Sequence, residues 1–273
     1  MEIVRRIVTG RLGVGVFVAG ALLILSSPSQ GQSWFSGDWS LTLGAAGMLM
    51  PEYEGDNTYR FYVQPLVSFG RQGTERRFTS RNDNISIGLI DTGDFRFGPT
   101  GKLVFGRDES DSNDLRGLDP IRFGVEIGAF AEVYPTDWVR LRGEVRRGIR
   151  AHDGVIAEIA ADAFTDLTDT VQVSAGPRLS WANDHYFDAY YGISARESAA
   201  SGLPEYHPGS GVRSVGIGGA IKWDVTDTVE TSVFAEYNRL TGPAADSSLV
   251  RERGSKNQFL FGVSATYRFD FSL

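Results

Sequence analysis

Cysteine is absent from this chain of 273 residues, and histidine occurs only three times. The lack of cysteine excludes disulfides and thiolate metal sites. His152, His185 and His207 all fall in expected turns or loops, and none has a second histidine at metal-ligand spacing. The sequence therefore predicts neither a metal centre nor a bound cofactor.

Long apolar runs are missing beyond residue 31, where no stretch approaches the roughly 20 apolar residues that a membrane helix needs. If the mature chain spans a membrane, it must do so as a closed barrel, because only a barrel then pairs every backbone N–H and C=O. The chain has 33 glycines and 12% aromatic residues, a composition that favours β structure with many turns.

The N-terminal region has the order of a secretory signal. Three arginines precede the apolar stretch 12–25, and small and polar residues follow up to Gly31. A membrane anchor is the alternative, but about 14 apolar residues are short for a span. We therefore expect a cleaved signal peptide at residues 1–31 and a single barrel domain at residues 32–273.

The charge balance is acidic. The formal net charge is −7, and removal of a signal that contains three arginines and one glutamate would make it more negative. This balance argues against binding of nucleic acid or anionic lipid.

The last strand carries the clearest pattern. In residues 257–273 every odd position from Phe259 onward is apolar, whereas the even positions are mostly polar or small. A period of two is the strand period, since successive side chains point to opposite faces. The aromatic face is typical of the closing strand of an outer-membrane barrel. The expected lipid-facing residues are Phe259, Phe261, Val263, Tyr267 and Phe269.

Similar alternation recurs along the chain and predicts an all-β, antiparallel, up-and-down transmembrane barrel of about twelve strands, with ten or fourteen as alternatives. No window keeps a helical period for 12 residues. The segment 76–80 alternates poorly. Counting it as a strand requires Asn82–Asn84 to form a tight external turn between it and the strand at 85–89. The expected strands are 39–49, 59–69, 76–80, 85–89, 95–105, 121–133, 139–149, 155–164, 170–181, 214–224, 227–240 and 257–273.

An even strand number places both chain ends on the periplasmic side, where turns are short. Three turns contain a Thr-Asp pair, at 136–137, 168–169 and 226–227. With these turns in the periplasm, the long segments 108–119, 183–213 and 241–256 all lie outside. The acidic segment 108–119 is either a solvated loop or a binder of divalent cations between lipopolysaccharide phosphates. The aromatic segment 183–213 could extend as a hairpin, fold over the mouth or form a docking surface.

Charged side chains alternate with the apolar ones and would face the lumen. A soluble β-sandwich also alternates, but its dry core could not bury such charges unpaired. Two interpretations remain open: a salt-bridged interior that fills a narrow barrel, or a small pore whose basic wall at Arg140, Arg142 and Arg146 favours anions. The candidate lumen charges are Arg60, Arg96, Lys102, Arg122, Glu126, Glu132, Arg140, Arg142, Glu144, Arg146, Glu158, Asp162, Arg178, Lys222, Glu230, Glu236 and Arg268.

Catalysis has little support in the sequence. Some twelve-stranded barrels are hydrolases with a serine and a histidine near the rim, and Ser180 with His185 is the one pair to consider. We favour an exposed loop histidine instead, because no G-x-S-x-G motif or phosphate-binding loop occurs in a strand–helix context. The sequence therefore predicts a protein that is not an enzyme.

Four stretches, taken in their order and spacing, resemble the MipA/OmpV family of Gram-negative outer-membrane proteins. One departure is Leu273, since such barrels usually end in phenylalanine, although Phe271 and Phe269 keep the parity that the barrel-insertion machinery reads. The matching stretches are Pro51–Gly55, Phe187–Ser194 running into Ser201–Leu203, Tyr237–Gly242 and Gly262–Phe269.

The resemblance implies an outer-membrane barrel in contact with lipid and lipopolysaccharide. It also implies partners, because the named member of the family is a scaffold that links a lytic transglycosylase to a peptidoglycan synthase. Other members are described as porin-like or adhesive. The resemblance therefore favours a non-catalytic envelope scaffold, with a small passive channel for polar or anionic solutes as the alternative.

Overall fold

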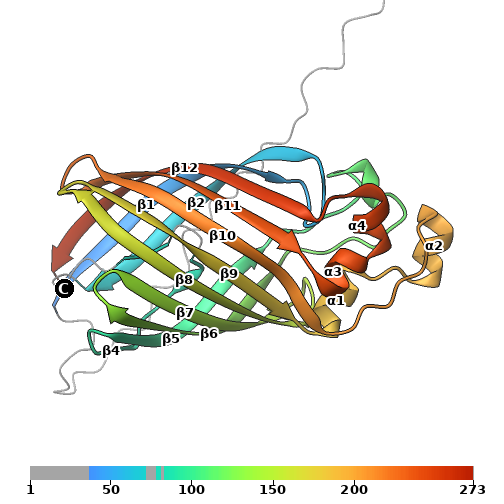
Figure 1. Cartoon of the computed structure of the whole chain (residues 1–273), viewed down its shortest axis with the longest axis horizontal. Coiled ribbons are helices and arrows are strands. Elements are labelled where there is room, and N and C mark those ends of the chain that lie inside the picture. The colour runs from blue at the N-terminus through green and yellow to red at the C-terminus, as the bar shows by residue number, and fades with distance from the viewer. Residues whose placement is uncertain (1–36, 72–77, 81–82, 273) are drawn as a thin grey trace, which may run out of the picture. The chain divides into compact units, whose positions relative to one another are not determined.

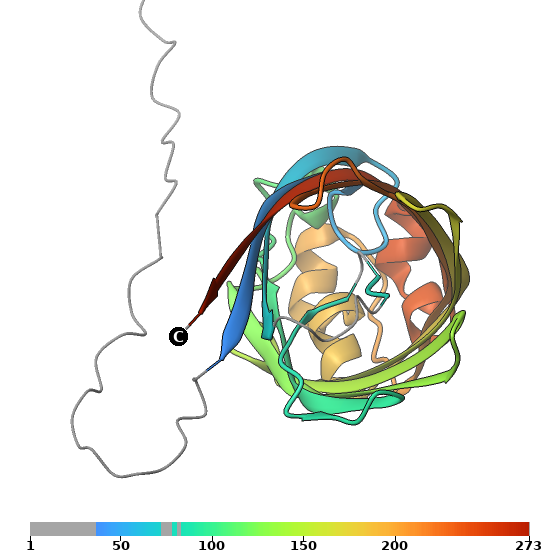
Figure 2. The same cartoon turned by 90° about the vertical axis from the view of Figure 1, so that its left-hand side faces the viewer.

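The computed structural model describes residues 37–71, 78–80 and 83–272, which form one barrel of antiparallel strands (Figures 1 and 2). The predicted fold class is confirmed. The twelve strands in these ranges are β1 (Asp38–Pro51), β2 (Tyr59–Arg71), β3 (Ile85–Ser86), β4 (Ile90–Asp91), β5 (Phe95–Val104), β6 (Gly124–Thr136), β7 (Val139–Ile149), β8 (Val155–Thr168), β9 (Val171–Ala182), β10 (Gly211–Asp224), β11 (Val229–Leu240) and β12 (Asn257–Ser272).

The terminal strand β12 closes the wall, as its alternation predicts. It lies between β1 and β11 in the sheet order β2-β1-β12-β11-β10-β9-β8-β7-β6-β5-β3. Its register with β1 runs without a shift from Trp39 opposite Phe271 to Leu49 opposite Phe261. Within the described ranges β2 and β3 stand at the two ends of this order, so the ring is nearly closed.

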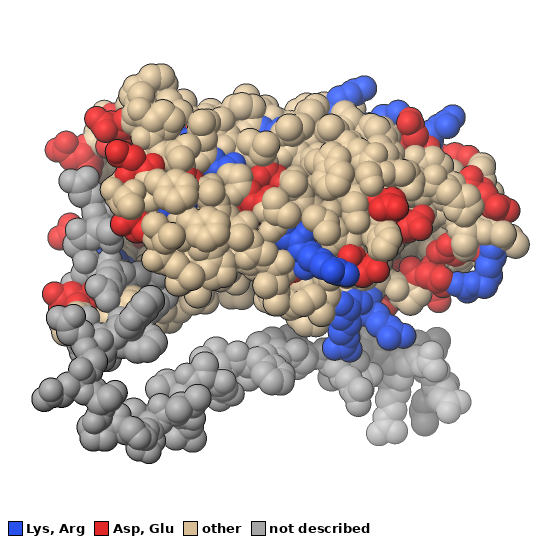
Figure 3. Space-filling view, turned by 90° about the horizontal axis from the view of Figure 1, so that it is seen from below, with Lys and Arg blue, Asp and Glu red and all other residues tan. Residues whose placement is uncertain are grey.

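Alternation in the wall separates an apolar outer surface from a charged lumen. On β7 the even-numbered residues from Arg140 to Gly148 are buried, whereas outward Val145 and Ile149 are 53% and 51% exposed. Figure 3 shows the result on one side of the molecule, where a broad uncharged surface separates charged groups at the two ends. None of the helices in the described part of the chain is long and apolar enough to span a membrane.

The wall differs from the sequence prediction at the third and fourth strands. Residues 76–77 lie outside the described ranges, and Phe78–Ser80 belong to no strand. Strand pairing in the wall resumes at Ile85, which lies opposite Gly101 of β5. The expected external turn at Asn82–Asn84 is also wrong, because Asp83 binds Arg140 inside the barrel. Residues 78–80 and 83–84 therefore lie inside the wall.

The two ends of the barrel are unlike each other. The β6–β7, β8–β9 and β10–β11 turns are short and share one end with the start of β1 and the end of β12 (Figure 1). The opposite, capped end carries the long connections, as predicted. These connections contain four short helices that the sequence did not predict: α1 (Asp184–Tyr191), α2 (Ala195–Ser201), α3 (Gly242–Asp246) and α4 (Ser248–Arg253).

Candidate functional site

A network of ion pairs built on β7 lines the lumen. Because side chains alternate along the strand, Arg140, Arg142 and Arg146 all point inward, and each is at most 5% exposed. A buried guanidinium is tolerable only if its N–H groups are paired. Each of these three meets at least two carboxylates, so the network forms the core of the lumen.

Arg140 occupies the part of the network nearer the termini. Its Nη2 donates to Asp162 Oδ2 at 2.7 Å and to Asp83 Oδ1 at 2.9 Å. Its guanidinium carbon lies 5.0 Å from the ring centroid of Phe78, which stacks on Phe164. Asp83 and Phe78 thus pack into the lumen, Asp83 through ion pairs with Arg140 and Arg142 and Phe78 through its stack on Phe164.

Arg142 and Arg146 continue the network towards the capped end. Arg142 pairs with Glu132 and, at 2.8 Å, with Glu144, which also contacts Arg146. Arg146 Nε donates to Glu126 at 2.8 Å. These contacts join β6 and β7 across the lumen face, so charge is balanced locally along the row.

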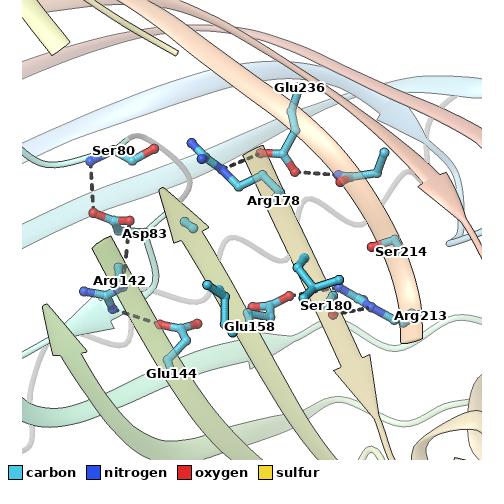
Figure 4. A pocket seen from close by; sticks show the side chains of 14 residues that line it. Ser80, Asp83, Arg142, Glu144, Glu158, Arg178, Ser180, Arg213, Ser214 and Glu236 are labelled. Atoms are coloured by element: carbon cyan, nitrogen blue, oxygen red, sulfur yellow. Dashed lines mark hydrogen bonds and ion pairs between the residues drawn. The ribbon is translucent and has the colours of Figure 1, made fainter. Parts of the chain in front are cut away.

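Strands on the other side of β7 extend the same network (Figure 4). Glu158 on β8 accepts hydrogen bonds from Arg146 and Arg213, both at 2.8 Å. Arg178 on β9 donates to Asp162 at 2.6 Å and lies 3.8 Å from Glu236 on β11. The side chains around them line a partly open cavity of about 100 Å³. A cavity of this volume can hold several water molecules.

The remaining candidate charges take different places. Arg96 pairs with Glu132 at 3.2 Å inside the barrel, and Arg268 pairs with Asp270 at 3.2 Å towards the termini. Lys102 is exposed. Two others lie at the capped rim rather than in the network: Arg60 bonds to Glu52 and Asp111, and Arg122 is exposed ahead of β6. Lys222 and Glu230 form a pair at 3.4 Å between β10 and β11.

The capped end closes over the network with an apolar core. Tyr186, Phe187 and Tyr191 of α1 are buried together with Leu240 and Val250. A second cluster contains Tyr53, Leu115, Ile193, Leu203 and Leu249. In Figure 2 the helices fill the view through the barrel from the end that carries the termini. Of the three arrangements considered for 183–213, the structure therefore selects folding over the mouth.

The turn Pro51–Gly55 ties this cap to the wall. Glu54 accepts hydrogen bonds from Arg213 on β10 and from the Tyr186 hydroxyl on α1, both at 2.8 Å. Gly55 donates to Gln258 of β12 and accepts from the backbone of Ser255. Its φ is +102°, and an added Cβ would lie 2.8 Å from Val250, so this position requires glycine.

Burial in the cap raises the pKa values of two tyrosines and one aspartate. It raises the pKa of the Tyr186 and Tyr191 hydroxyls well above the ordinary value, and the nearby carboxylate of Glu54 adds to the shift. Burial also raises the pKa of Asp56, whose backbone carbonyl accepts a hydrogen bond from Gln258. The tyrosines therefore stay neutral hydrogen-bonding groups at neutral pH.

The histidines divide into buried and exposed. His152 is buried, bonds to Glu126 at 3.2 Å and packs edge-on against Tyr186. His185 is exposed and pairs with Asp153 at 3.2 Å. Ser180 accepts a hydrogen bond from Arg213 at 2.8 Å. Each member of the serine–histidine pair that the sequence suggested thus has another partner.

Sequence reasoning missed four residues of the site: Asp83, Glu54, Arg213 and His152. None of them lies in a stretch where strand alternation was clear. Arg213 precedes the strand expected at 214–224. Its spacing from Lys222 is odd, so simple alternation would place the two side chains on opposite faces. The register shift of β10 between Val212 and Ser214 breaks this alternation. Only the density of polar residues around Pro51–Gly55 could have signalled a role at the rim.

The predicted lipid-facing residues of β12 share the outer surface. Phe259, Phe261, Val263, Tyr267 and Phe269 are between 42% and 56% exposed, and their inward neighbours Ser264 and Thr266 are buried. The rings of Tyr267 and Phe269 lie 4.6 Å apart between centroids. The exposed aromatic surface on this strand faces away from the lumen network.

Comparison with known proteins gives one family match. The family model described as MltA-interacting protein MipA matches residues 43–269. No curated protein matches the chain.

Several solved structures resemble the barrel at low identity. A bacterial polysaccharide outer membrane secretin is 10% identical, with a TM-score of 0.42, covering 84% of this chain and 98% of its own. The monoaromatic hydrocarbon channel CymD is 9% identical, with a TM-score of 0.38 and coverages of 86% and 89%. Neisserial surface protein A is 11% identical, with a TM-score of 0.28 and coverages of 85% and 99%. These similarities are too distant to bear on function.

Proposed function

The chain belongs to the MipA family of outer-membrane β-barrel proteins, and from this premise we propose that it is a non-catalytic envelope scaffold. The family is described by an interaction with MltA, a lytic transglycosylase. The scaffold would hold such an enzyme, together with a peptidoglycan synthase, at the periplasmic side of the membrane.

The observation that supports a scaffold over a channel is the obstructed lumen. The ion pairs of Arg140, Arg142 and Arg146 occupy the interior together with Asp83, and the apolar clusters of the four helices cover the mouth. An open pore needs a continuous water-filled path. A barrel that is filled by ion pairs in the lumen and by the cap at its mouth is better suited to bind a partner on its surface than to pass solutes.

The periplasmic surface would give a partner a small contact area. The turns there are short, but each presents an exposed apolar side chain: Trp138 is 59% exposed, Leu167 63% and Val225 43%. Interfaces that bury less than about 1,200 Å² are typical of weak and transient complexes. We therefore expect a partner that dissociates during purification unless it is covalently trapped.

Site-specific photo-crosslinking tests the scaffold. A photoreactive phenylalanine analogue in place of Trp138 or Leu167 should trap a murein enzyme in intact cells, identified by mass spectrometry. The same analogue at Arg196, which is exposed at the capped end, serves as the control. Equal yields from the two ends, or no murein enzyme among the trapped proteins, would refute the proposal.

The second candidate is a small passive channel for polar or anionic solutes. The charged lining of the lumen cavity, which includes Arg142, Arg178 and Arg213, supports it. Planar bilayers separate the two candidates, because a filled barrel should give no conductance steps above the protein-free background. Reproducible steps with anion selectivity would support the channel instead.

A further inference from the structure

The outer surface of β7 carries one charge among apolar neighbours. Arg147 is exposed, and it lies two positions from outward Val145 and two from outward Ile149 along the strand. Across the ladders it pairs with Ile127 of β6, which is 56% exposed, and with Val155 of β8. This arginine therefore belongs to the surface that faces lipid.

Two more arginines lie at the capped end of the same pair of strands. Arg150 directly follows β7, and Arg122 lies two residues ahead of β6. The two ends adjoin, since Val125 pairs with Ile149. Figure 3 shows basic side chains, with acidic ones among them, on this side of the molecule where the largely uncharged surface meets the charged capped end. Arg122, Arg147 and Arg150 are defined here as the outer arginine cluster.

The outer arginine cluster has no anionic partner among the residues that the structure describes. Among the described residues none of the three arginines forms an ion pair, whereas the lumen arginines of β7 each contact at least two carboxylates. The nearby Asp153 pairs with His185 at 3.2 Å. The cluster therefore keeps its guanidinium N–H groups available for an external anion.

The depth of Arg147 favours an external anion. Phe123 and Phe105 form an edge-to-face pair, with centroids 6.1 Å apart, four residues further towards the capped end than Ile127. Aromatic side chains of this kind mark the membrane interface. Arg147 starts on the membrane side of them, where a charge costs more free energy the deeper it lies. Its long side chain can extend to the interface, but it still needs a counter-charge there.

The chemistry of the outer leaflet supplies that counter-charge. Long loops of outer-membrane barrels lie on the extracellular side, so the capped end faces the leaflet of lipopolysaccharide. Guanidinium groups bind phosphate through paired N–H donors. We propose that the outer arginine cluster binds the phosphates of the lipid A headgroup, whose acyl chains pack on Ile127 and Ile149. The acidic net charge of −7 argues against general attraction of anionic lipid, but this cluster presents positive charge at one place on the surface.

Binding of purified lipid A tests the site. The full chain, folded in detergent micelles, is titrated with bisphosphorylated lipid A and with its dephosphorylated form, and binding is followed by native mass spectrometry. The triple variant R122Q/R147Q/R150Q should bind bisphosphorylated lipid A at least about tenfold more weakly than the unmodified protein. The dephosphorylated lipid should bind both proteins equally weakly.

Arg239 offers a matched control on another part of the wall. It is exposed near the capped end of β11, and its Nη1 donates to Asn257 at 3.1 Å. R239Q should leave lipid A affinity within about twofold, since this arginine has a partner in the protein. Heat-modifiable migration on gels checks that every variant is folded. Equal losses in R239Q and the triple variant, or equal binding of the two lipids by the unmodified protein, would overturn the proposal.

Discussion

At the scale of single residues, Arg140 illustrates how the lumen is stabilised. Its side chain is fully buried, and its Nη atoms are shared between Asp162 of β8 and Asp83 of the segment before β3. A buried ion pair gives little net stability when complete, because desolvation offsets attraction. Breaking the pair is costly, because the remaining carboxylates stay buried without a counter-charge.

Substitution of Arg140 by methionine should therefore destabilise the barrel strongly. We expect a loss of about 3–5 kcal/mol in the free energy of unfolding, as for other buried pairs that lose one partner. Arg268→Met is the matched control, since its side chain is 31% exposed, and it should cost at most about 1 kcal/mol. Urea unfolding in lipid vesicles, followed by tryptophan fluorescence, measures both. Similar losses in the two variants would show that burial does not set the cost.

The sequence predicts the inward arginines and most of their carboxylate partners, but it does not predict Asp83. Arg140, Arg142 and Arg146 follow the period of two, so their common face is determined by the strand. Asp83 lies where the chain leaves the wall, and no local pattern indicates which long-range partner it meets. Alternation specifies the face of a side chain, whereas pairing between distant segments depends on the closed barrel.

At the scale of elements, β12 shows where sequence is sufficient. The strand runs for 16 residues and pairs on both sides. Its register is fixed, because a slip of one residue would turn Phe261 and Val263 into the lumen and Ser264 towards lipid. Length, parity and the outward-facing residues of this strand thus follow from its alternation.

A charge at the middle of β12 should be costly. Val263 lies opposite Gly47 on β1 and Val233 on β11, far from either end of the strand. Val263→Arg is expected to lower the free energy of unfolding by about 2–4 kcal/mol, as at the bilayer midplane. Phe271→Arg, on the same face near the chain end, should cost about 0–1 kcal/mol. Folding titrations in vesicles measure both losses. Equal losses for the two variants would place the two positions at the same depth and contradict the prediction.

The helices show where sequence is insufficient. α1 has 8 residues and α2, α3 and α4 have 7, 5 and 6, so none is long enough to establish a helical period. Such short helices are stable only through tertiary packing. Local signals do exist, such as the capping box of Ser194 and Glu197, but they indicate a helix start and not a fold over the mouth.

At the scale of the whole molecule, the cap and the wall form one structure. Glu54 links the β1–β2 turn to β10 and α1, and Gly55 links the same turn to β12. Arg253 of α4 donates to the backbone of Asp114 at 2.6 Å, which adds the β5–β6 connection. Local opening of the cap therefore requires several of these contacts to break together.

Removal of the Glu54 carboxylate should loosen the cap without unfolding the wall. Glu54→Ala leaves Arg213 with Glu158 and deprives Tyr186 of its acceptor. A hydrogen bond to a charged group contributes about 1.5–3 kcal/mol, so opening should become at least about tenfold more frequent. Trypsin cleavage after the exposed Arg251 of α4 measures the opening in lipid vesicles. Asp119→Ala, which removes only the exposed pair with Arg196, should leave the cleavage rate nearly unchanged. Equal acceleration by the two variants would mean that the cap is held by surface contacts and not by its link to the wall.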